Sequence, residues 1–237
     1  MYTRALLKFS GEQLSGKHEF GIDPNVARYI AQECKKIVEA GTQLVLVIGG
    51  GNLVRGAQVA TEGSGIKRVT ADQMGMLSTL MNAMALTDIF ESEGVKTRCM
   101  SNVYATQIAE SFSFRLAEKH LQRGRVVIVA GGLGRPFFTT DTAAISIALE
   151  LGCNVVLKAT KVDGVYDKDP NKFDDAVKFD KLDYQRALET DAIKVMDKAA
   201  LGLAMEQHMP VIVLDALTDD NALHVIQGNT TIGTYIS

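Results

Sequence analysis

The amino-acid sequence predicts an α/β fold, with a mostly parallel central sheet sandwiched between helices in three αβα layers. Short apolar segments rich in β-branched residues alternate with longer segments of helical period, which is typical of strands joined by crossover helices. Several of these segments show no polar alternation, as is usual for strands covered on both faces. The 237 residues, 46% of them hydrophobic, are enough for one large domain. Because residues 165–182 are polar and rich in Asp and Lys, we expect an N-terminal lobe at about 1–160 and a C-terminal lobe at about 161–237 that share one sheet.

Seven segments are expected to form strands, and helix ends can be placed by their caps. The strands are expected at residues 5–9, 43–48, 97–100, 125–130, 154–159, 211–214 and 231–236. A helix at 24–40 has Asp23 as its N-cap, Pro24 in its first position and Gly41 just past its end. Four more glycines follow helical stretches and predict the same kind of ending: Gly94, Gly124, Gly152 and Gly228.

A long helix expected at residues 72–93 carries apolar side chains on more than one narrow stripe. They are Met74, Met76, Leu77, Leu80, Met81, Met84, Leu86, Ile89 and Phe90. Such a helix must bury a second face. Burial inside a large monomer and contact with another subunit explain the pattern equally well.

Charge and composition disfavour several kinds of partner and location. Lys and Arg total 25 against 28 Asp and Glu, so the net charge is −3 and the chain lacks the basic excess of a general nucleic-acid or membrane-surface binder. No apolar run approaches the roughly 20 residues of a membrane helix, and no signal-peptide pattern is visible, which predicts a cytoplasmic protein. Cys34, Cys99 and Cys153 are too widely spaced for a disulfide framework or a zinc site, so we expect core residues and no resident metal.

Glycine-bearing loops follow four of the predicted strands, at residues 10–12, 49–52, 131–134 and 160–164. In an open α/β sheet such loops meet at the carboxyl ends of the strands, where ligands bind. Glycine lets backbone N–H groups approach an anion closely, and helix N-termini add partial positive charge. The sequence therefore predicts a phosphate site, and the three consecutive glycines at 49–51 favour it over simple tight turns.

The segment from Gly11 to His18 is similar to a P-loop but does not fit one. It follows a predicted strand and contains Gly16 and Lys17, yet His18 stands where Ser or Thr would bind Mg²⁺. The next helix also has its own cap at Asp23, whereas a P-loop runs directly into its helix. The first loop has no GxGxxG fingerprint either, which disfavours an NAD-dependent function.

Three charged residues near these loops are candidates for handling phosphate. Lys8 lies in an apolar strand two residues before Ser10, where a lysine directed at a phosphate explains its position better than a paired or surface lysine does. Arg55 follows the triple glycine and could be a second clamp, although an ordinary surface arginine fits almost as well. Asp141 lies where a hydroxyl-rich loop enters a helix, and N-capping by Thr140 or Asp141 is the alternative interpretation.

Seven motifs, spread over almost the whole chain, carry a resemblance to a known family. They are LLKFSGE at 6–12, FGID at 20–23, VIGGGNLVRG at 47–56, MGML at 74–77, PFFTTDT at 136–142, LKATKVDGVY at 157–166 and KVMD at 194–197. With these motifs the chain resembles the bacterial uridylate kinases (UMP kinases) of the amino acid kinase family. The resemblance implies transfer of the γ-phosphoryl group of ATP to UMP, giving UDP and ADP, in pyrimidine nucleotide and CTP biosynthesis.

The resemblance also implies residue roles. ATP, carrying Mg²⁺, would bind to Lys8, Phe9, Ser10, Gly11, Gly51, Arg55, Thr160, Tyr166 and Asp169. UMP would bind to Gly50, Asp72, Leu133, Gly134, Arg135, Pro136, Phe137, Phe138, Thr139 and Thr140. Lys8, Arg55 and Asp141 would be catalytic, and we expect Asp141 to organise Lys8 or the metal rather than to act as a base.

Assembly and regulation are implied in the same way. The family is expected to form a homohexamer, a trimer of dimers, with the helix at 72–93 at a dimer contact. UTP would inhibit the enzyme, and in many bacteria GTP would activate it through a segment that corresponds here to Gly16, Lys17, His18, Glu19, Phe20 and Gly21.

Three positions depart from the family pattern. Leu133 and Arg135 stand where Thr and Asn are common, which could strengthen phosphate capture or loosen acceptor recognition. Glu19 replaces a common Gly, which leaves activation by GTP open. Two alternatives therefore stay open: phosphorylation of another acceptor, such as a carboxylate or carbamate, and a non-catalytic nucleotide-sensing relative.

Overall fold

A computed structural model of the chain describes residues 1–54, 59–60, 64–190 and 195–237. The strands are β1 (Arg4–Phe9), β2 (Gln43–Ile48), β3 (Thr97–Ser101), β4 (Glu110–Ser111), β5 (Val126–Ala130), β6 (Val155–Ala159), β7 (Val165–Tyr166), β8 (Lys178–Phe179), β9 (Lys181–Leu182), β10 (Val211–Leu214) and β11 (Thr234–Ile236). The helices are α1 (Gly11–Leu14), α2 (Pro24–Glu39), α4 (Arg68–Ser92), α5 (Phe114–Gln122), α6 (Thr140–Glu150), α7 (Tyr184–Glu189), α8 (Lys198–Glu206) and α9 (Asn221–Ile226).

Nine of the described strands form one sheet, in the order β4-β3-β5-β2-β1-β6-β10-β11-β9. Neighbouring strands run parallel except for β10 and β11, which are antiparallel. In the centre of the sheet, Lys8 of β1 lies level with Val47 of β2 and with Lys158 of β6. The mostly parallel sheet predicted from the sequence is confirmed, and β7 and β8 form a separate antiparallel pair.

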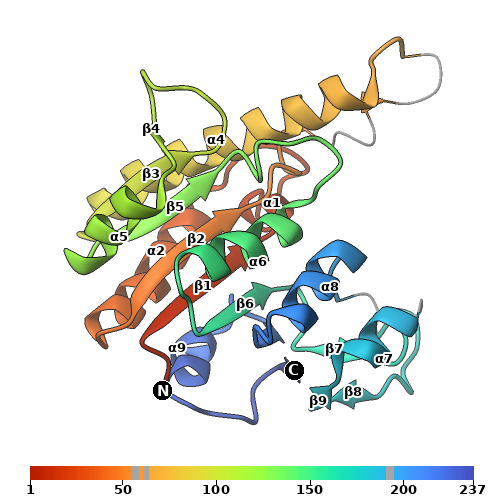
Figure 1. The fold of residues 1–237 in the computed structure, drawn as a ribbon. Coiled ribbons are helices and arrows are strands. Elements are labelled where there is room, and N and C mark those ends of the chain that lie inside the picture. The colour runs from red at the N-terminus through yellow and green to blue at the C-terminus, as the bar shows by residue number, and fades with distance from the viewer. Residues whose placement is uncertain (55–58, 61–63, 191–194) are drawn as a thin grey trace.

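Helices cover both faces of this sheet, which gives the predicted three layers (Figure 1). Helices α2, α4 and α9 pack on one face, and α5, α6 and α8 pack on the other. Alternate residues of β1 point to opposite layers, so Leu7 and Phe9 join the core on the α2 side whereas Leu6 joins the core on the α6 side. Lys8 follows the alternation of Leu6, and its side chain therefore points toward α6.

Most predicted elements are confirmed to within two residues, and two boundaries need correction. The strand predicted at 231–236 begins only at Thr234, because Asn229 accepts a hydrogen bond from the backbone N–H of Thr231 at 2.8 Å and turns the chain there. The helix predicted at 72–93 starts earlier, at Arg68, whose Nε lies 2.7 Å from Asp72 Oδ1 one turn later. Strands β4, β7, β8 and β9 were not predicted, because two residues carry no periodic pattern.

The predicted helix ends are confirmed. Asp23 caps α2 by accepting a hydrogen bond from the N–H of Asn25 at 2.9 Å. Each glycine placed after a helix has a positive φ, as a left-handed ending requires: Gly41, Gly94, Gly124, Gly152 and Gly228.

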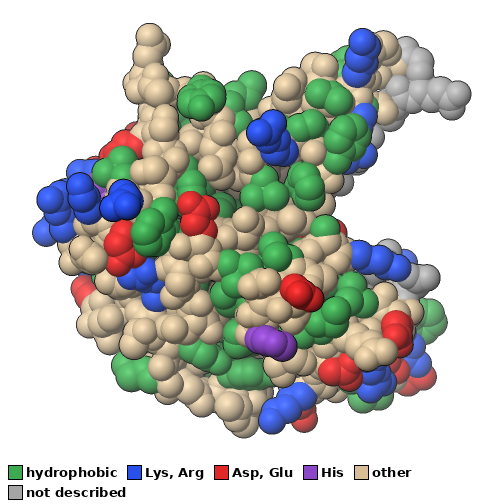
Figure 2. All heavy atoms as spheres, viewed as in Figure 1, with side chains coloured by type: hydrophobic (Ala, Val, Ile, Leu, Met, Phe, Trp, Pro, Cys, Tyr) green, Lys and Arg blue, Asp and Glu red, His purple; other side chains and the backbone are tan. Residues whose placement is uncertain are grey.

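Helix α4 packs one face into the core and exposes apolar side chains elsewhere. Leu80, Leu86 and Phe90 are buried, whereas Leu77 and Met81 are 49% and 57% exposed. Figure 2 shows hydrophobic side chains on the part of α4 that projects from the body of the molecule. Burial within one chain therefore does not explain Leu77 and Met81, and a subunit contact at this helix stays a prediction.

The cysteines differ in burial. Cys34 and Cys153 are buried as predicted, and all three thiols are free. Cys99 lies on β3, one strand in from the edge of the sheet, and is only partly buried against the core, so its placement inside the core needs correction. Burial raises the pKa of the Cys153 thiol to about 12 and that of Cys99 to about 11. Within the described residues, no helix is long and apolar enough to cross a membrane.

A substitution at Thr234 of β11 tests how the small β7–β8 pair is attached to the sheet. The fully buried hydroxyl of Thr234 accepts a hydrogen bond from Val165 N at 2.8 Å and donates one to Phe179 O at 2.5 Å. Thr234→Val keeps the shape but leaves both backbone groups unpaired, so we expect a loss of about 2–4 kcal/mol in the free energy of unfolding. Urea unfolding followed by circular dichroism measures it. Thr234→Ser retains the hydroxyl and serves as the control, and equal losses in both variants would contradict this role.

Candidate active site

The loops after β1 and β2 lie against each other at the carboxyl end of the sheet. The N–H of Gly49 donates to Phe9 O at 2.9 Å. A Cβ on Gly11 would lie 2.6 Å from Gly49 O, and one on Gly50 would lie 2.8 Å from Gly75 O in α4, so only glycine fits at these two positions. These contacts give the close backbone packing that a phosphate loop needs. Figure 2 shows the surface hollowed between the N-terminal half of α4 and the part of the molecule that carries α7 and α8.

Two buried asparagines hold the triple-glycine loop in shape. The side-chain amides of Asn52 and Asn82 bond to each other at 2.7 and 3.0 Å, and Asn82 also donates to Gly49 O at 2.8 Å. Asn52 donates to Gly21 O at 2.8 Å, which fastens the segment before α2 to the same loop. Sequence reasoning missed both residues, although Asn82 is a polar position in a largely apolar helix.

A buried carboxylate lies between two lysines next to these loops. Lys8 Nζ is 2.6 Å from Asp141 Oδ1, and Lys158 Nζ donates to Asp141 Oδ2 at 2.7 Å. The three side chains come from β1, α6 and β6 and are only 8%, 12% and 14% exposed. The structure thus brings Lys8 and Asp141 together as expected. Lys158 was missed as a site residue, although it carries the same signal as Lys8, a lysine within an apolar strand.

Burial and charge both act on this group. Burial by itself would raise the pKa of the Asp141 carboxyl, but the ammonium groups of Lys8 and Lys158 outweigh burial and hold that pKa below its ordinary value. Burial lowers the pKa of Lys158, against the effect of the Asp141 carboxylate, and the Lys8 ammonium adds to the lowering. Asp141 is therefore ionised at neutral pH and is suited to hold the lysines rather than to exchange a proton.

The start of α6 is fastened to the start of α8 through Asp197. Thr139 is the N-cap of α6, since its backbone is extended and its hydroxyl accepts a hydrogen bond from the N–H of Asp141 at 3.0 Å. The alternative interpretation of this segment, N-capping by Thr140 or Asp141, does not hold, because both residues already lie inside the helix. Asp197 caps α8 and also accepts hydrogen bonds from the hydroxyls of Thr139 and Thr142, the latter at 2.9 Å. Sequence reasoning did not identify Asp197 as a site residue.

A cavity of about 190 Å³ lies between α4 and the loop after β5. Asp72 is in its wall and fixes that loop, because Oδ2 accepts a hydrogen bond from the N–H of Phe137 at 2.9 Å while Oδ1 pairs with Arg68. Among the residues expected to bind UMP, the cavity is lined by Gly50, Asp72, Leu133, Arg135, Phe138, Thr139 and Thr140. Pro136 and Phe137 do not line it, and Gly134 lines a neighbouring cavity instead.

The residues expected to bind ATP fall into two groups. The first lies around the loops of β1 and β2 and comprises Lys8, Ser10, Gly11 and Gly51. Phe9 is 1% exposed and packs in the core on the α2 side, so only its backbone can face a nucleotide. The second group, Thr160, Tyr166 and Asp169, lies beyond β6, and its last two members line a cavity of about 320 Å³. Arg55 lies outside the described residues.

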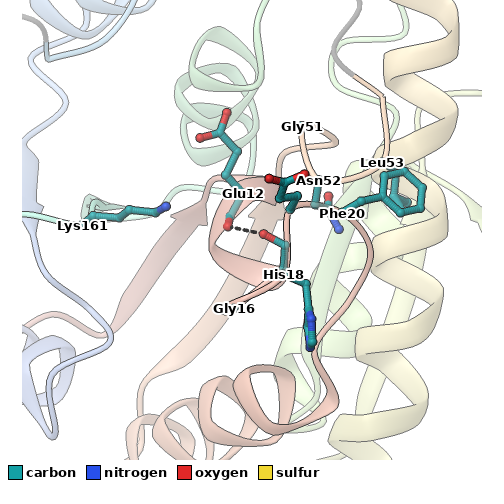
Figure 3. A pocket seen from close by; sticks show the side chains of 10 residues that line it. Glu12, Gly16, His18, Phe20, Gly51, Asn52, Leu53 and Lys161 are labelled. Atoms are coloured by element: carbon teal, nitrogen blue, oxygen red, sulfur yellow. Dashed lines mark hydrogen bonds between the residues drawn. The ribbon is translucent and has the colours of Figure 1, made fainter.

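The segment expected to be linked to GTP borders a cavity of about 470 Å³, whose wall also includes Gly51, a residue expected to bind ATP (Figure 3). The residues of that segment in its wall are Gly16, His18, Glu19 and Phe20, whereas Lys17 and Gly21 are not. Figure 3 shows Lys161 extending toward α1, the short helix that carries Glu12. The next long helix begins only at Pro24, so Lys17 does not enter a P-loop helix, in agreement with the sequence interpretation.

Comparisons with known proteins agree with this arrangement. The model of the amino acid kinase family matches residues 3–215. The uridylate kinase of Sulfurovum sp. is 48% identical over 236 residues and that of Wolinella succinogenes is 49% identical over 234, covering 100% and 99% of this chain and 100% and 96% of theirs.

Solved structures give the same result. The UMP kinase of Bacillus anthracis superposes with a TM-score of 0.94 at 34% identity, covering 100% of this chain and 96% of the other. The UMP kinase of Ureaplasma parvum superposes with a TM-score of 0.91 at 28% identity, covering 100% and 99%. The chain therefore belongs to the amino acid kinase family and, within it, groups with the uridylate kinases.

Proposed function

We propose that this protein transfers the γ-phosphoryl group of ATP to UMP and releases UDP and ADP. The observation that carries the proposal is the buried Lys8–Asp141 pair. Lys8 lies two residues before the glycine loop at 10–12, and Asp141 directly follows Thr139 and Thr140, which line the cavity between α4 and the loop after β5. Full-length relatives named uridylate kinase support UMP as the acceptor over a carboxylate or carbamate. Among the described residues, no feature favours the non-catalytic alternative.

The phosphate of UMP must approach the γ-phosphate of ATP in this reaction, so the site has to offset the repulsion between these two anions. The N–H of Gly49 is already bonded to Phe9 O, so the backbone N–H groups of Gly50 and Gly51 and the N-terminus of α6 would supply the fixed dipoles, and Lys8 a full positive charge. Because charge spreads over the transferred group in the transition state, catalysis consists mainly of positioning and electrostatic stabilisation. No covalent intermediate is needed.

Asp141 has a positioning role in this proposal. The phosphate of UMP is already largely ionised near neutral pH and needs no general base. The ionised carboxylate instead fixes the Lys8 ammonium near the end of β1, the strand that leads into the glycine loop at 10–12. Because Thr139 and Thr140 line the acceptor cavity and Asp141 follows them in α6, the acceptor phosphate and Lys8 can approach each other at this helix start.

We assign the substrates to the two sides of this centre. ATP would bind to Lys8, Ser10, Gly11, Gly51 and the backbone of Phe9, then extend over Thr160, Tyr166 and Asp169, with Arg55 as a further ligand. UMP would occupy the cavity lined by Gly50, Asp72 and the loop at 133–140. Within the described residues, no group of three or more His, Cys, Asp or Glu side chains could hold a metal ion, and we propose that Mg²⁺ enters with the phosphates of ATP.

The proposal extends to assembly, control and cellular role, which rest on the family resemblance. We propose two lobes that share one sheet, divided near residue 160, and a cytoplasmic homohexamer built from dimers that meet through the exposed apolar side chains of α4. UTP would inhibit the enzyme, and activation by GTP through the segment at 16–21 stays open because Glu19 replaces a common Gly there. The product UDP would feed pyrimidine nucleotide and CTP biosynthesis.

Acceptor choice tests the reaction directly. ADP release from Mg-ATP should depend on UMP and be at least about tenfold slower with CMP, dCMP, N-acetylglutamate or carbamate, a preference of about 1.4 kcal/mol. A coupled ADP assay with each acceptor measures this. UMP-dependent turnover would make Leu133 and Arg135 tolerated variants of the acceptor loop. Turnover with another acceptor, or with none while UTP still binds, would contradict the proposal.

Lys8→Met tests the central cation. Removing one fixed charge at the transferring phosphoryl group should lower kcat by about 10²–10³-fold. Steady-state kinetics measures the loss, and thermal unfolding verifies that the variant is folded. Lys119→Met changes an exposed lysine of α5 and is the matched control, which should retain full turnover. Near-normal kcat in well-folded Lys8→Met would show that the mechanism is wrong.

A further inference from the structure

Lys158 is a second lysine in the same small space as Lys8. The two residues lie level with each other on the neighbouring strands β1 and β6, and both side chains point to the α6 face. Each ammonium takes a different oxygen of Asp141, at 2.6 Å for Lys8 and 2.7 Å for Lys158. Lys158 also donates to the backbone oxygen of Val195, just before α8. The Asp141 carboxylate therefore forms ion pairs with two buried ammonium groups.

Two ammonium groups paired with one carboxylate are more positive charge than a purely structural contact needs. A single lysine paired with Asp141 would already neutralise the carboxylate. Adding a second ammonium group costs desolvation, and the lowered pKa of Lys158 is the sign of that cost. Two ammonium groups and one carboxylate leave one net positive charge in a largely buried place. Such a charge is stabilised when an anion enters.

The next acidic group does not cancel this charge. Asp197 acts on Lys158 electrostatically, but both of its oxygens accept hydrogen bonds from Thr139 and Thr142, and it caps α8. Its negative charge therefore lies at the N-termini of two helices, where helix dipoles compensate it. Lys158 and Asp141 line a cavity of about 350 Å³ against α7 and α8. Lys8 lies near the end of β1, two residues before the glycine loop at 10–12, so the uncancelled positive charge lies beside the start of that loop.

We propose that Lys158 is a positioning residue that gives this site its net positive charge: by holding Asp141, it leaves the charge of Lys8 available to the polyphosphate of the donor nucleotide. The inference rests on the proposed phosphoryl transfer and goes beyond it by naming the source of the attraction for the donor phosphates. Lys158 acts through Asp141 and need not touch the substrate.

The test measures binding of inorganic tripolyphosphate, without Mg²⁺, by isothermal titration calorimetry. Lys158→Met replaces the ammonium by an apolar group of similar length and should weaken tripolyphosphate binding by about 10–100-fold, as expected for loss of one charge a few ångströms away. The same variant should unfold at an unchanged or higher temperature, because it removes a desolvated charge. A purely structural lysine would instead lower the unfolding temperature when it is replaced.

A double variant separates charge from shape. Asp141→Asn combined with Lys158→Met again leaves one net positive charge and should bring tripolyphosphate affinity back to within about threefold of the original protein, although turnover stays low because Lys8 is no longer fixed. Unchanged affinity in Lys158→Met, or a loss that the double variant does not recover, would overturn the inference. Because tripolyphosphate binding needs no acceptor, failure of this test is distinct from failure of UMP as the substrate.

Discussion

The contact of Asp141 with two lysines is the constraint on which the rest of the site depends. A carboxylate buried at the start of α6 has to be ionised to hold Lys8, and it stays ionised because the two ammonium groups lower its pKa more than burial raises it. The topology of the sheet supplies this arrangement. Strands β1 and β6 are neighbours although about 150 residues separate them, so Lys8 and Lys158 lie side by side and face the same helix.

Other parts of the fold keep that contact in place. Asp197 joins the first turn of α6 to the first turn of α8, and the Asn52–Asn82 pair fixes the triple-glycine loop against α4. The two asparagines are buried and bond to each other, and Asp197 accepts hydrogen bonds from Thr139, Thr142 and the backbone of α8, so each contact restrains its part of the site. A rigid, cationic pocket lined by backbone N–H groups is suited to reactions whose main requirement is to bring two phosphates together.

Much of the fold could be predicted from the sequence, because its central strands are apolar on both faces and five of the described helices are followed by glycines with positive φ. Lys8 and Asp141 could be found because a lysine in an apolar strand and an aspartate at a helix start are visible locally. Lys158 carries the same local signal as Lys8. That it shares Asp141 with Lys8, and that Asp197 bridges two helices, depends on which distant segments become neighbours, and no local pattern encodes that. The N-cap of α6 could not be assigned from the sequence, since Thr139, Thr140 and Asp141 are all good capping residues and only the backbone conformation identifies Thr139.

The most direct test of this account is a crystal structure with Mg²⁺, a non-hydrolysable ATP analogue and UMP bound. The account predicts that Lys8 Nζ lies within about 3.2 Å of a phosphate oxygen of the ATP analogue, that Lys158 stays on Asp141, and that UMP fills the cavity beside Asp72. Donor phosphates bound away from Lys8, or a Lys158 side chain that leaves Asp141 to contact UMP, would contradict it.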